Sequence, residues 1–564
     1  MGSASLFSQL DMGKRSLTSS QSGINVAGHN IANINNEDYS RQRVDLESQH
    51  PKRSRFGAGV DINGVKRQTD VFLNRRLISE QARGGSLSVR ADTLRRLENL
   101  FNDTEGLGLR QPLNDFWDAW GKLANQPESE IFRKDVLTNA KTLSNRFQGV
   151  AADMTNIREE LNGRVAMQVS KINQLAAQLA KQNTLIQQTE RGSGETNDLR
   201  DQREGTLKEL SSLVQVDWFE DDEHLVNVSV GNGWPLVLGR RNNLLEASYR
   251  SDEVGFFSLR GVDSKGMTRE LTDLVKGGEL RELLDLRDET VPSFMKRVDE
   301  LASEMSFNVN RVHASGTGLN STFDRVTSSF ALRGDAVERP LPFIKDGSFT
   351  IHMVDDDNDL TEEYSFQVYA GQDNIRDVVN RINTQLGPER ELDAKLNSDG
   401  SVTLASLGPH RFILGRDDAN FAVVMGFNNF FENLEGAKDI RVNERLLRNP
   451  QQISTGKNLI PGDNTVALSV HQLQFEPTMR GGSVTFDEFY NGITSELGLT
   501  INSSNTDLRN QELVIDQFKK LRDEVSSVNM DEEVADMVQY QRGFDAAAKF
   551  ISTVDDMTRT VINM

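Results

Sequence analysis

The sequence of 564 residues contains no cysteine, which excludes disulfide bonds, thiolate metal sites and cysteine nucleophiles. Proline is scarce, with 12 residues, and this scarcity leaves room for long uninterrupted helices. No apolar run reaches the length of a membrane span, and none of signal-peptide length occurs near the start. If the protein leaves the cell, we therefore expect it to do so without a cleaved signal.

Positive charge is also in short supply. The 64 lysines and arginines face 84 acidic residues, which gives a formal net charge of −20. Such a chain repels phosphate groups, so general nucleic-acid binding and docking onto anionic membranes are disfavoured. We expect no nucleic-acid partner and no membrane insertion, and the acidity most simply serves solubility.

Motifs of catalytic and cofactor sites are missing as well. The seven histidines are scattered, no His-Glu-x-x-His occurs, and no glycine-rich loop has nucleotide-binding spacing. The run Asp355–Asp359 spaces three acids as a calcium loop does, but Leu360 and Phe366 replace the required glycine and bidentate glutamate. A solvated turn between strands fits this run better. The sequence predicts no cofactor, no metal and no enzyme activity.

What the chain does contain is a narrow helical seam at each end, in which apolar or small residues recur at steps of three and four. Such a seam is typical of a helix that packs beside another helix. We predict that the two ends pair with each other or with neighbouring copies, the alternative being that each covers part of an ordinary core. The predicted contact residues are Leu6, Leu10, Leu17, Ile24, Ile31, Met537, Tyr540, Phe544, Ala547, Ile551, Val554 and Val561, with Gly13, Ser20 and Ala27 on the same N-terminal face.

The terminal segments are not expected to be stable alone. Burying six large seam residues contributes on the order of 10–15 kcal/mol. Ordering about 35 residues costs on the order of 50 kcal/mol before helix hydrogen bonds are counted. We therefore expect loose ends in an isolated monomer, which become ordered when partners supply more buried surface.

Between its ends the chain changes character, in the order helix, strands, helix, strands, helix. Strands are predicted over Val214–Val275 and in an inserted block, Ser321–Gly436, whose strand-like runs include Phe421–Phe427. We predict an α+β, multidomain fold with a discontinuous helical coiled-coil stalk formed by both chain ends and with inserted β-rich outer domains. The expected domains are a terminal coiled coil (1–40 plus 527–564), a helical stalk (41–213 plus 277–320 plus 480–526), a small β subdomain (214–276) and an outer β-rich domain (321–479).

Basic residues gather beside the N-terminal seam. Nine lysines and arginines, against four acids, lie between Arg41 and Arg76. Such a collar either meets the acidic surface of a neighbouring copy or forms a solvated loop.

Two terminal motifs resemble the signatures of bacterial flagellar axial proteins. "GHNIANINNEDYSRQRV" (Gly28–Val44) is similar to the N-terminal signature of rod, hook and hook-associated proteins, and "NMDEEVADMVQYQRGFDAAAKFISTVDDM" is similar to the C-terminal one. Interior segments such as "PLNDFWDAWGKLANQPESEIFRKDV", "GGELRELLDLRDETV" and "DIRVNERLLRNPQQIS" resemble the junction proteins within that family. The residues that carry the N-terminal signature are Asn30, Ile31, Ala32, Asn33, Tyr39, Ser40, Arg41 and Gln42.

This resemblance implies a structural role. Such proteins are exported unfolded through the flagellar type III channel and form a ring that connects hook to filament, with terminal helices lining the axial tube. The implied partners are the hook protein, a second hook–filament junction protein, further copies of the chain, and an export chaperone on the C-terminal helix. The implied location is the flagellum, either extracellular or periplasmic. The alternatives are a hook or distal-rod protein and, in another class, a secreted enzyme or adhesin with coiled-coil ends.

Overall fold

The computed structural model describes residues 2–48, 59–103, 106, 108–191, 196–249, 255–319, 321–332, 334–387, 391–433, 435–457 and 459–563, without the side chains of residues 2–5 and 561. The chain folds into two compact units. The first unit comprises Met1–Thr93, Glu159–Arg287 and Asn502–Met564, and the second comprises Leu94–Arg158 and Asp288–Ile501. Three long helices contain residues of both units: α2 (Val71–Leu100), α4 (Glu130–Arg191) and α12 (Phe486–Ser526).

The first unit combines long helices with small antiparallel sheets. Its other helices are α1 (Gly2–Ala32), α5 (Asn197–Leu213), α6 (Gly278–Asp285) and α13 (Met530–Asn563). Strands β1 (Gln42–Ser48) and β2 (Val60–Arg67) form a hairpin. A four-stranded sheet has the order β3 (Asp217–Glu220), β4 (Val226–Val230), β5 (Trp234–Leu238), β6 (Arg241–Asn242). A three-stranded sheet has the order β7 (Leu244–Tyr249), β8 (Phe257–Val262), β9 (Thr268–Glu270).

Local sequence explains where these elements begin and turn. Asp70 begins α2 by accepting hydrogen bonds from the backbone N–H groups of Phe72 (2.8 Å) and Leu73 (3.1 Å). Gly231–Gly233 turns β4 into β5 with three successive positive φ angles, of 49°, 57° and 85°. Such angles favour the sequence Gly-Asn-Gly. The strands predicted over Val214–Val275 are confirmed, because β3 to β9 lie within this range.

A buried carboxylate makes the stability of the first unit depend on pH. Glu282 in α6 is 8% exposed, and its carboxylate lies 3.5 Å from the guanidinium of Arg90. Burial raises the pKa of Glu282 to about 7, although Arg90 opposes the shift. The folded state therefore holds this proton more tightly than the unfolded chain. As pH rises from about 4.5 to 7, the free energy of unfolding should fall by about 2–3 kcal/mol.

Glu282→Gln should remove this dependence, because glutamine mimics the protonated acid. We expect the variant to be about 2–3 kcal/mol more stable than the parent at pH 8 and nearly equal to it at pH 4. Urea unfolding at the two pH values measures the difference. Glu209→Gln is the control, since that carboxylate is 51% exposed beside Lys171. A gain from Glu282→Gln of equal size at both pH values would contradict this account.

The second unit surrounds short sheets with helices. Its helices are α3 (Arg110–Asn125), α7 (Val291–Ala314), α8 (Ile375–Leu386), α9 (Phe421–Met425), α10 (Glu444–Arg448) and α11 (Thr465–Gln472). The first sheet has the order β12 (Leu360–Val368), β11 (Gly347–Val354), β15 (Arg411–Asp417). The second has the order β10 (Arg325–Thr327), β14 (Val402–Ser406), β13 (Leu392–Leu396). Strands β16 (Phe431–Glu432) and β17 (Arg441–Val442) form a pair, and a π-helical turn, Leu286–Thr290, precedes α7.

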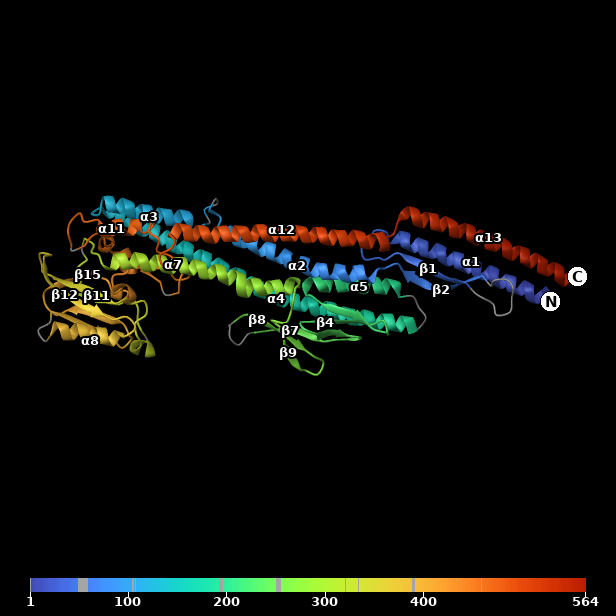
Figure 1. The fold of residues 1–564 in the computed structure, drawn as a ribbon, viewed down its shortest axis with the longest axis horizontal. Coiled ribbons are helices and arrows are strands. Elements are labelled where there is room, and N and C mark those ends of the chain that lie inside the picture. Colours follow the sequence, from blue (N-terminus) through green and yellow to red (C-terminus); the bar gives the residue numbers. More distant parts are fainter. Residues whose placement is uncertain are drawn as a thin grey trace. The chain divides into compact units, whose positions relative to one another are not determined.

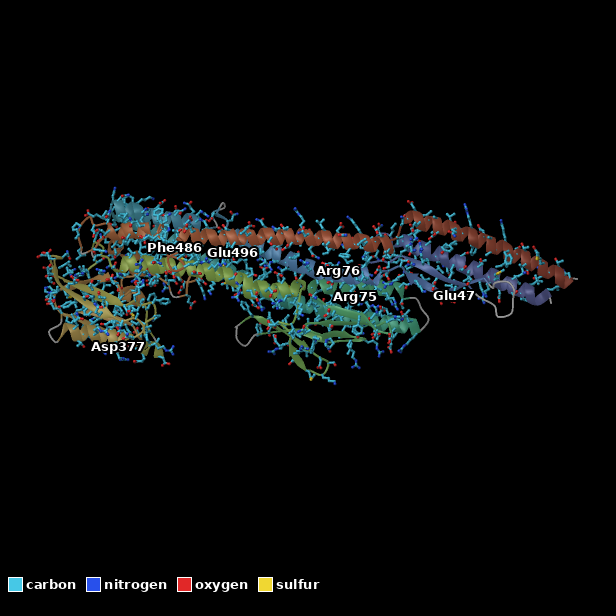
Figure 2. All side chains as sticks on the ribbon, viewed as in Figure 1. Glu47, Arg75, Arg76, Asp377, Phe486 and Glu496 are labelled. Carbon is cyan, nitrogen blue, oxygen red and sulfur yellow. The ribbon has the colours of Figure 1, made fainter. Side chains whose placement is uncertain are left out.

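Aromatic packing and an ion pair hold the start of α12 within the second unit. Phe486 stacks on Trp117 of α3, with ring centroids 5.7 Å apart. Ten residues further along α12, Glu496 accepts a hydrogen bond of 2.8 Å from Arg297 of α7 (Figure 2). Elsewhere in the unit, α8 lies beside the sheet that contains β11 and β12 (Figure 1).

The prediction of a strand over Phe421–Phe427 is wrong. Phe421–Met425 forms the short helix α9, because Asp417 accepts hydrogen bonds from the backbone N–H groups of Phe421 (3.0 Å) and Ala422 (2.7 Å). Gly426 then ends the helix with a φ of 77°. A short apolar run does not distinguish strand from helix by periodicity, and here a side-chain contact from the preceding strand decides between them.

The α+β, multidomain class predicted from the sequence is confirmed. The finer division into four domains stays a prediction. Across the described ranges, no helix combines the length and the apolar character needed to cross a bilayer. Within those same ranges, His, Asp and Glu form no group of three that could hold a metal ion.

Candidate functional site

The two chain ends pair in the first unit, as predicted. Helices α1 and α13 lie side by side (Figure 1). Gly13 lies against Ile551 and Gly23 against Tyr540, while Asn30 bonds to Glu533. Moving forward along α1 therefore means moving backward along α13, so the pair is antiparallel.

Small residues of α1 form the closest contact with α13. Gly13, Ser20, Gly23 and Ala27 are buried at helical spacing. A Cβ atom on Gly23 would lie 2.5 Å from the Tyr540 ring, and one on Gly13 would lie 2.6 Å from Cγ1 of Ile551. Larger side chains at these two positions would force the helices apart. The periodicity of the sequence predicts Gly13, Ser20 and Ala27 on this face of α1 but does not include Gly23.

Of the large residues predicted to make contacts, Tyr540 and Ile551 lie directly against Gly23 and Gly13. Ala547 and Val554 are buried, at 5% and 2% exposure. Leu6, Leu10, Leu17, Ile24, Ile31, Met537, Tyr540, Phe544 and Ile551 are half-buried. Val561 lies in α13, but its side chain is outside the described part of the chain. In a single copy, much apolar surface therefore remains beside the paired helices.

Asn30 joins the end of α1 to two other elements. Its Nδ2 donates to the Gln42 carbonyl and to Oε2 of Glu533, both at 2.9 Å. Its Oδ1 accepts from the Gln42 backbone N–H (3.0 Å) and from the Tyr39 hydroxyl (2.8 Å). At 1% exposure Asn30 uses all its hydrogen-bonding capacity. This single side chain therefore sets the position of α1 against both β1 and α13.

Arg41 makes a second connection to α13. Its guanidinium donates to Glu533 and to Glu532, in each case at 2.6 Å, and lies 3.5 Å from Asp536. Burial disfavours the charge of Arg41, but these hydrogen bonds and charges outweigh it and raise the pKa of Arg41. The backbone N–H of Arg41 also donates to the carbonyl of Ser526, at the end of α12. Glu532 and Glu533 lie in the first turn of α13, where the helix dipole favours negative charge.

Ser40 and Gln42 of the N-terminal signature bond to the start of α5. The backbone N–H of Ser40 donates to Asp201 (3.1 Å), and Nε2 of Gln42 donates to Asp198 (2.9 Å). Burial, followed by the nearby charges of Asp198 and Asp201, raises the pKa of Tyr39, which keeps its hydroxyl a donor. The motif therefore fastens α1, β1, α5 and α13 together. We call this set of contacts, built on Asn30, Tyr39, Ser40, Arg41 and Gln42, the signature network.

Much of the predicted basic collar is satisfied inside the same chain. Arg41 bonds to α13, and Arg67 pairs with Asp201 at 2.5 Å. Arg75 and Arg76 lie on α2 (Figure 2), with the Arg75 guanidinium over the Trp218 ring at 5.4 Å. Further pairs are Lys66 with Asp45 (2.6 Å) and Arg76 with Glu80 (2.7 Å). Lys52, Arg53 and Arg55 lie outside the described residues.

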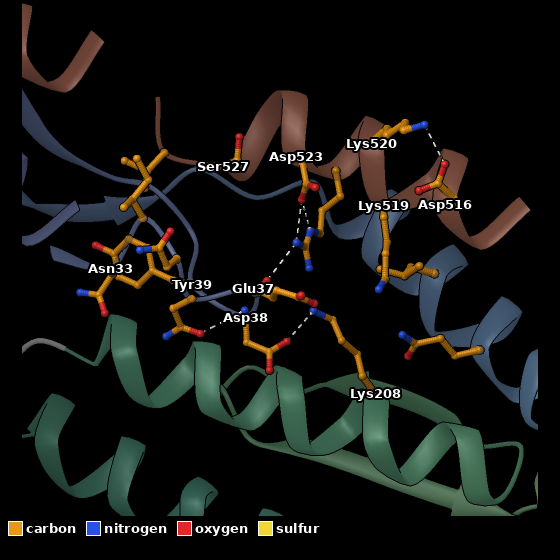
Figure 3. Close-up of a pocket in the computed structure, with 17 residues that line it drawn as sticks. Asn33, Glu37, Asp38, Tyr39, Lys208, Asp516, Lys519, Lys520, Asp523 and Ser527 are labelled. Atoms are coloured by element: carbon orange, nitrogen blue, oxygen red, sulfur yellow. Dashed lines mark hydrogen bonds and ion pairs between the residues drawn. The ribbon is translucent and has the colours of Figure 1, made fainter. Parts of the chain in front are cut away.

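A cleft of about 560 Å³ borders the loop that follows α1 (Figure 3). Residues 33–39 of this loop, including the signature residue Asn33, form one side. Lys208 of α5 pairs with Asp38 at 3.2 Å, and Arg522 of α12 donates to the Glu37 carbonyl at 2.9 Å. The remaining signature residues are the half-buried Ile31 and the exposed Ala32, in the last turn of α1. Three ion pairs, Lys208 with Asp38, Lys520 with Asp516 and Arg522 with Asp523, lie around the cleft, which suits a joint between elements better than a reaction centre.

Sequence reasoning did not find Glu533 or Asp201 as partners of the signature. The only available signal was the acidic start of the C-terminal motif, and it did not indicate which acid is buried. In the structure the Glu533 side chain is 3% exposed, whereas that of neighbouring Glu532 is 56% exposed.

Two family models match parts of the chain. The family model described as the flagellar hook-associated protein FlgK helical domain matches residues 94–325. The model described as flagellar basal body rod FlgEFG protein C-terminal matches residues 522–564.

Full-length relatives and a solved structure also match. The flagellar hook-associated protein 1 of Salmonella typhimurium is 25% identical over 558 residues, covering 97% of this chain and 98% of that relative. The protein of the same name from Bacillus subtilis is 24% identical over 573 residues, covering 99% and 98%. The structure of the flagellar hook junction protein FlgK from Burkholderia pseudomallei has a similar fold. Its TM-score is 0.52 at 14% identity, with 80% of this chain and 100% of that chain covered.

Proposed function

Because the chain belongs to the family of flagellar hook-associated protein 1, we propose that it is a structural protein that joins hook to filament in the bacterial flagellum. The observation that carries this proposal is the pairing of α1 with α13. One copy leaves the large seam residues half-buried, so further copies packed alongside would bury the remaining apolar surface. The matching family models and relatives confirm the flagellar family that the sequence motifs predicted.

The proposed assembly is a ring of identical copies whose paired helices form the wall of the axial tube. The seam residues of α1 and α13 bind neighbouring subunits in this ring. The signature network supports such a role, because it fixes the direction in which the paired helices leave the rest of the first unit. A rigid joint of this kind lets every copy present the same surfaces to its neighbours.

The proposal extends to partners and location. The chain associates with other flagellar structural proteins, which we take to be the hook protein and a second hook–filament junction protein. It travels through the flagellar type III channel, with an export chaperone covering α13 beforehand, and acts outside the cytoplasm without catalysing a reaction. A hook or distal-rod role is less well supported, because the hook-associated helical domain matches the interior.

Complementation tests this function. The chain is expressed in a motile bacterium whose own hook-associated protein 1 has been deleted, so that hooks remain bare. We expect filaments to grow again, visible by electron microscopy, and swimming to return. The control is the same chain without residues 527–564, which lacks α13 and should leave the hooks bare. Bare hooks with the secreted full-length chain would overturn the proposal, and rescue of a hook-protein deletion would favour the hook role.

A further inference from the structure

A cavity of about 540 Å³ lies in the second unit, between α7, α9 and two loops. Aromatic side chains form much of its wall: Phe307 comes from α7, and Phe330 and Phe343 come from the loops. Its size falls within the range of small-ligand sites, and its mostly apolar lining with a few polar groups is typical of them. The assembly role proposed above makes no use of this cavity.

The loop that carries Phe343 is held in an unfavourable backbone conformation. Phe343 has a φ of 59°, which is rare for a bulky residue, and its side chain is 80% exposed. Hydrogen bonds fix the loop on both sides: Leu341 N–H donates to the carbonyl of Asp373 (3.1 Å), and Lys345 N–H donates to that of Ala419 (3.0 Å). Strain of this kind costs on the order of 1–3 kcal/mol and recurs at ligand clamps. The chain thus holds an aromatic ring in solvent at the rim of a cavity.

The cavity lining includes one carboxylate, Glu304, and an amide oxygen without a partner, that of Asn429. Glu304 of α7 lines it, and burial, followed by the charge of Glu300, raises the pKa of Glu304. Among the described residues, no lysine, arginine or histidine forms an ion pair with Glu304, and none lines the cavity. Asn429, which is 1% exposed, also lines the cavity. Its Nδ2 donates to the Val423 carbonyl, while its Oδ1 has no hydrogen-bond partner among the described residues.

We propose that this cavity binds an organic ammonium group carried on an apolar body. Aromatic faces attract such cations through their ring quadrupoles, and a carboxylate without a cation supplies the opposite charge. The rings of Phe307, Phe330 and Phe343 make no ring–ring contact with other described aromatic residues, so their faces are not taken up by stacking. A ligand with an anionic head would instead meet Glu304 and be repelled.

The test compares three probes of equal length on the full chain: 3-phenylpropylamine, 3-phenylpropan-1-ol and 3-phenylpropanoate. Isothermal titration calorimetry at pH 7.5 measures each affinity. We expect saturable binding of one amine per chain, binding of the alcohol at least tenfold weaker, and no binding of the carboxylate. Glu304→Gln should weaken the amine about tenfold and leave the alcohol unchanged, because only the amine is charged.

A pair of exposed phenylalanines supplies the control for the aromatic wall. Phe343→Ser should weaken both the amine and the alcohol at least fivefold, since it removes part of the wall. Phe475→Ser should change neither, because Phe475 is 67% exposed in the same unit but does not line the cavity. The proposal is overturned if the amine does not saturate, if Glu304→Gln binds it as tightly as the parent, or if the carboxylate binds as well as the amine.

Discussion

Replacing Glu533 by alanine should destabilise the first unit by about 3–5 kcal/mol and release the start of α13 from the signature network. The Glu533 side chain is 3% exposed and that of Arg41 is 10% exposed, with Nε and Oε1 2.6 Å apart. Removing the carboxylate leaves the buried guanidinium of Arg41 with less negative charge and one fewer hydrogen-bond acceptor beside it. It also removes the acceptor for Nδ2 of Asn30. Two buried donors thus lose a partner at once, and an unmade buried hydrogen bond is itself costly.

The adjacent residue is a matched control. Glu532 also bonds to Arg41 at 2.6 Å, but its side chain is 56% exposed, so Glu532→Ala should cost at most about 1 kcal/mol. Urea unfolding gives both values, and hydrogen exchange across residues 28–44 locates the damage. Arg41→Met combined with Glu533→Leu should recover much of the loss, because no buried charge is left unpaired. Equal effects from the two glutamates would show that burial does not govern this pair.

Gly23→Val should separate α1 from α13. The added Cβ would lie 2.5 Å from Cγ of Tyr540, and Cγ cannot swing aside without movement of its own helix. We expect a loss of about 1–3 kcal/mol in the pairing of the helices and, as a consequence, failure of the chain to restore filaments in complementation.

Gly28→Val tests the same change on the same helix. No atom lies within 4 Å of a Cβ built on Gly28, so this variant should pair normally, with a small gain because valine is a better helix former than glycine. Limited proteolysis followed by mass spectrometry of the fragments measures how well the chain ends of the two variants resist cleavage. The Gly23 variant should lose both chain ends at protease concentrations that leave the Gly28 variant intact. Identical digestion of the two variants would mean that the close contact at Gly23 does not hold the helices together.

The sequence predicted that the ends pair and placed Gly13, Ser20 and Ala27 on the pairing face of α1, but it did not include Gly23. Hydrophobic periodicity weights large apolar residues, and it predicted Tyr540 and Ile551, which lie against Gly23 and Gly13 of α1. Glycine and serine carry little hydropathy, so Gly23 left no signal, although backbone proximity depends on small side chains. The residues that bond to the N-terminal signature could not be predicted from the sequence. Asn30 and Glu533 are 503 positions apart, and nothing local in the sequence indicates that they touch.

The same separation has a consequence for how the protein is made. Closing a loop of 503 residues between Asn30 and Glu533 is a highly non-local event, so this contact should form after the intervening units have become compact. A chain that stops anywhere before Met530 has no α13, and its α1 keeps an uncovered small-residue face. The pairing of α1 with α13 therefore distinguishes truncated chains from those synthesised through α13, because only the latter can form it.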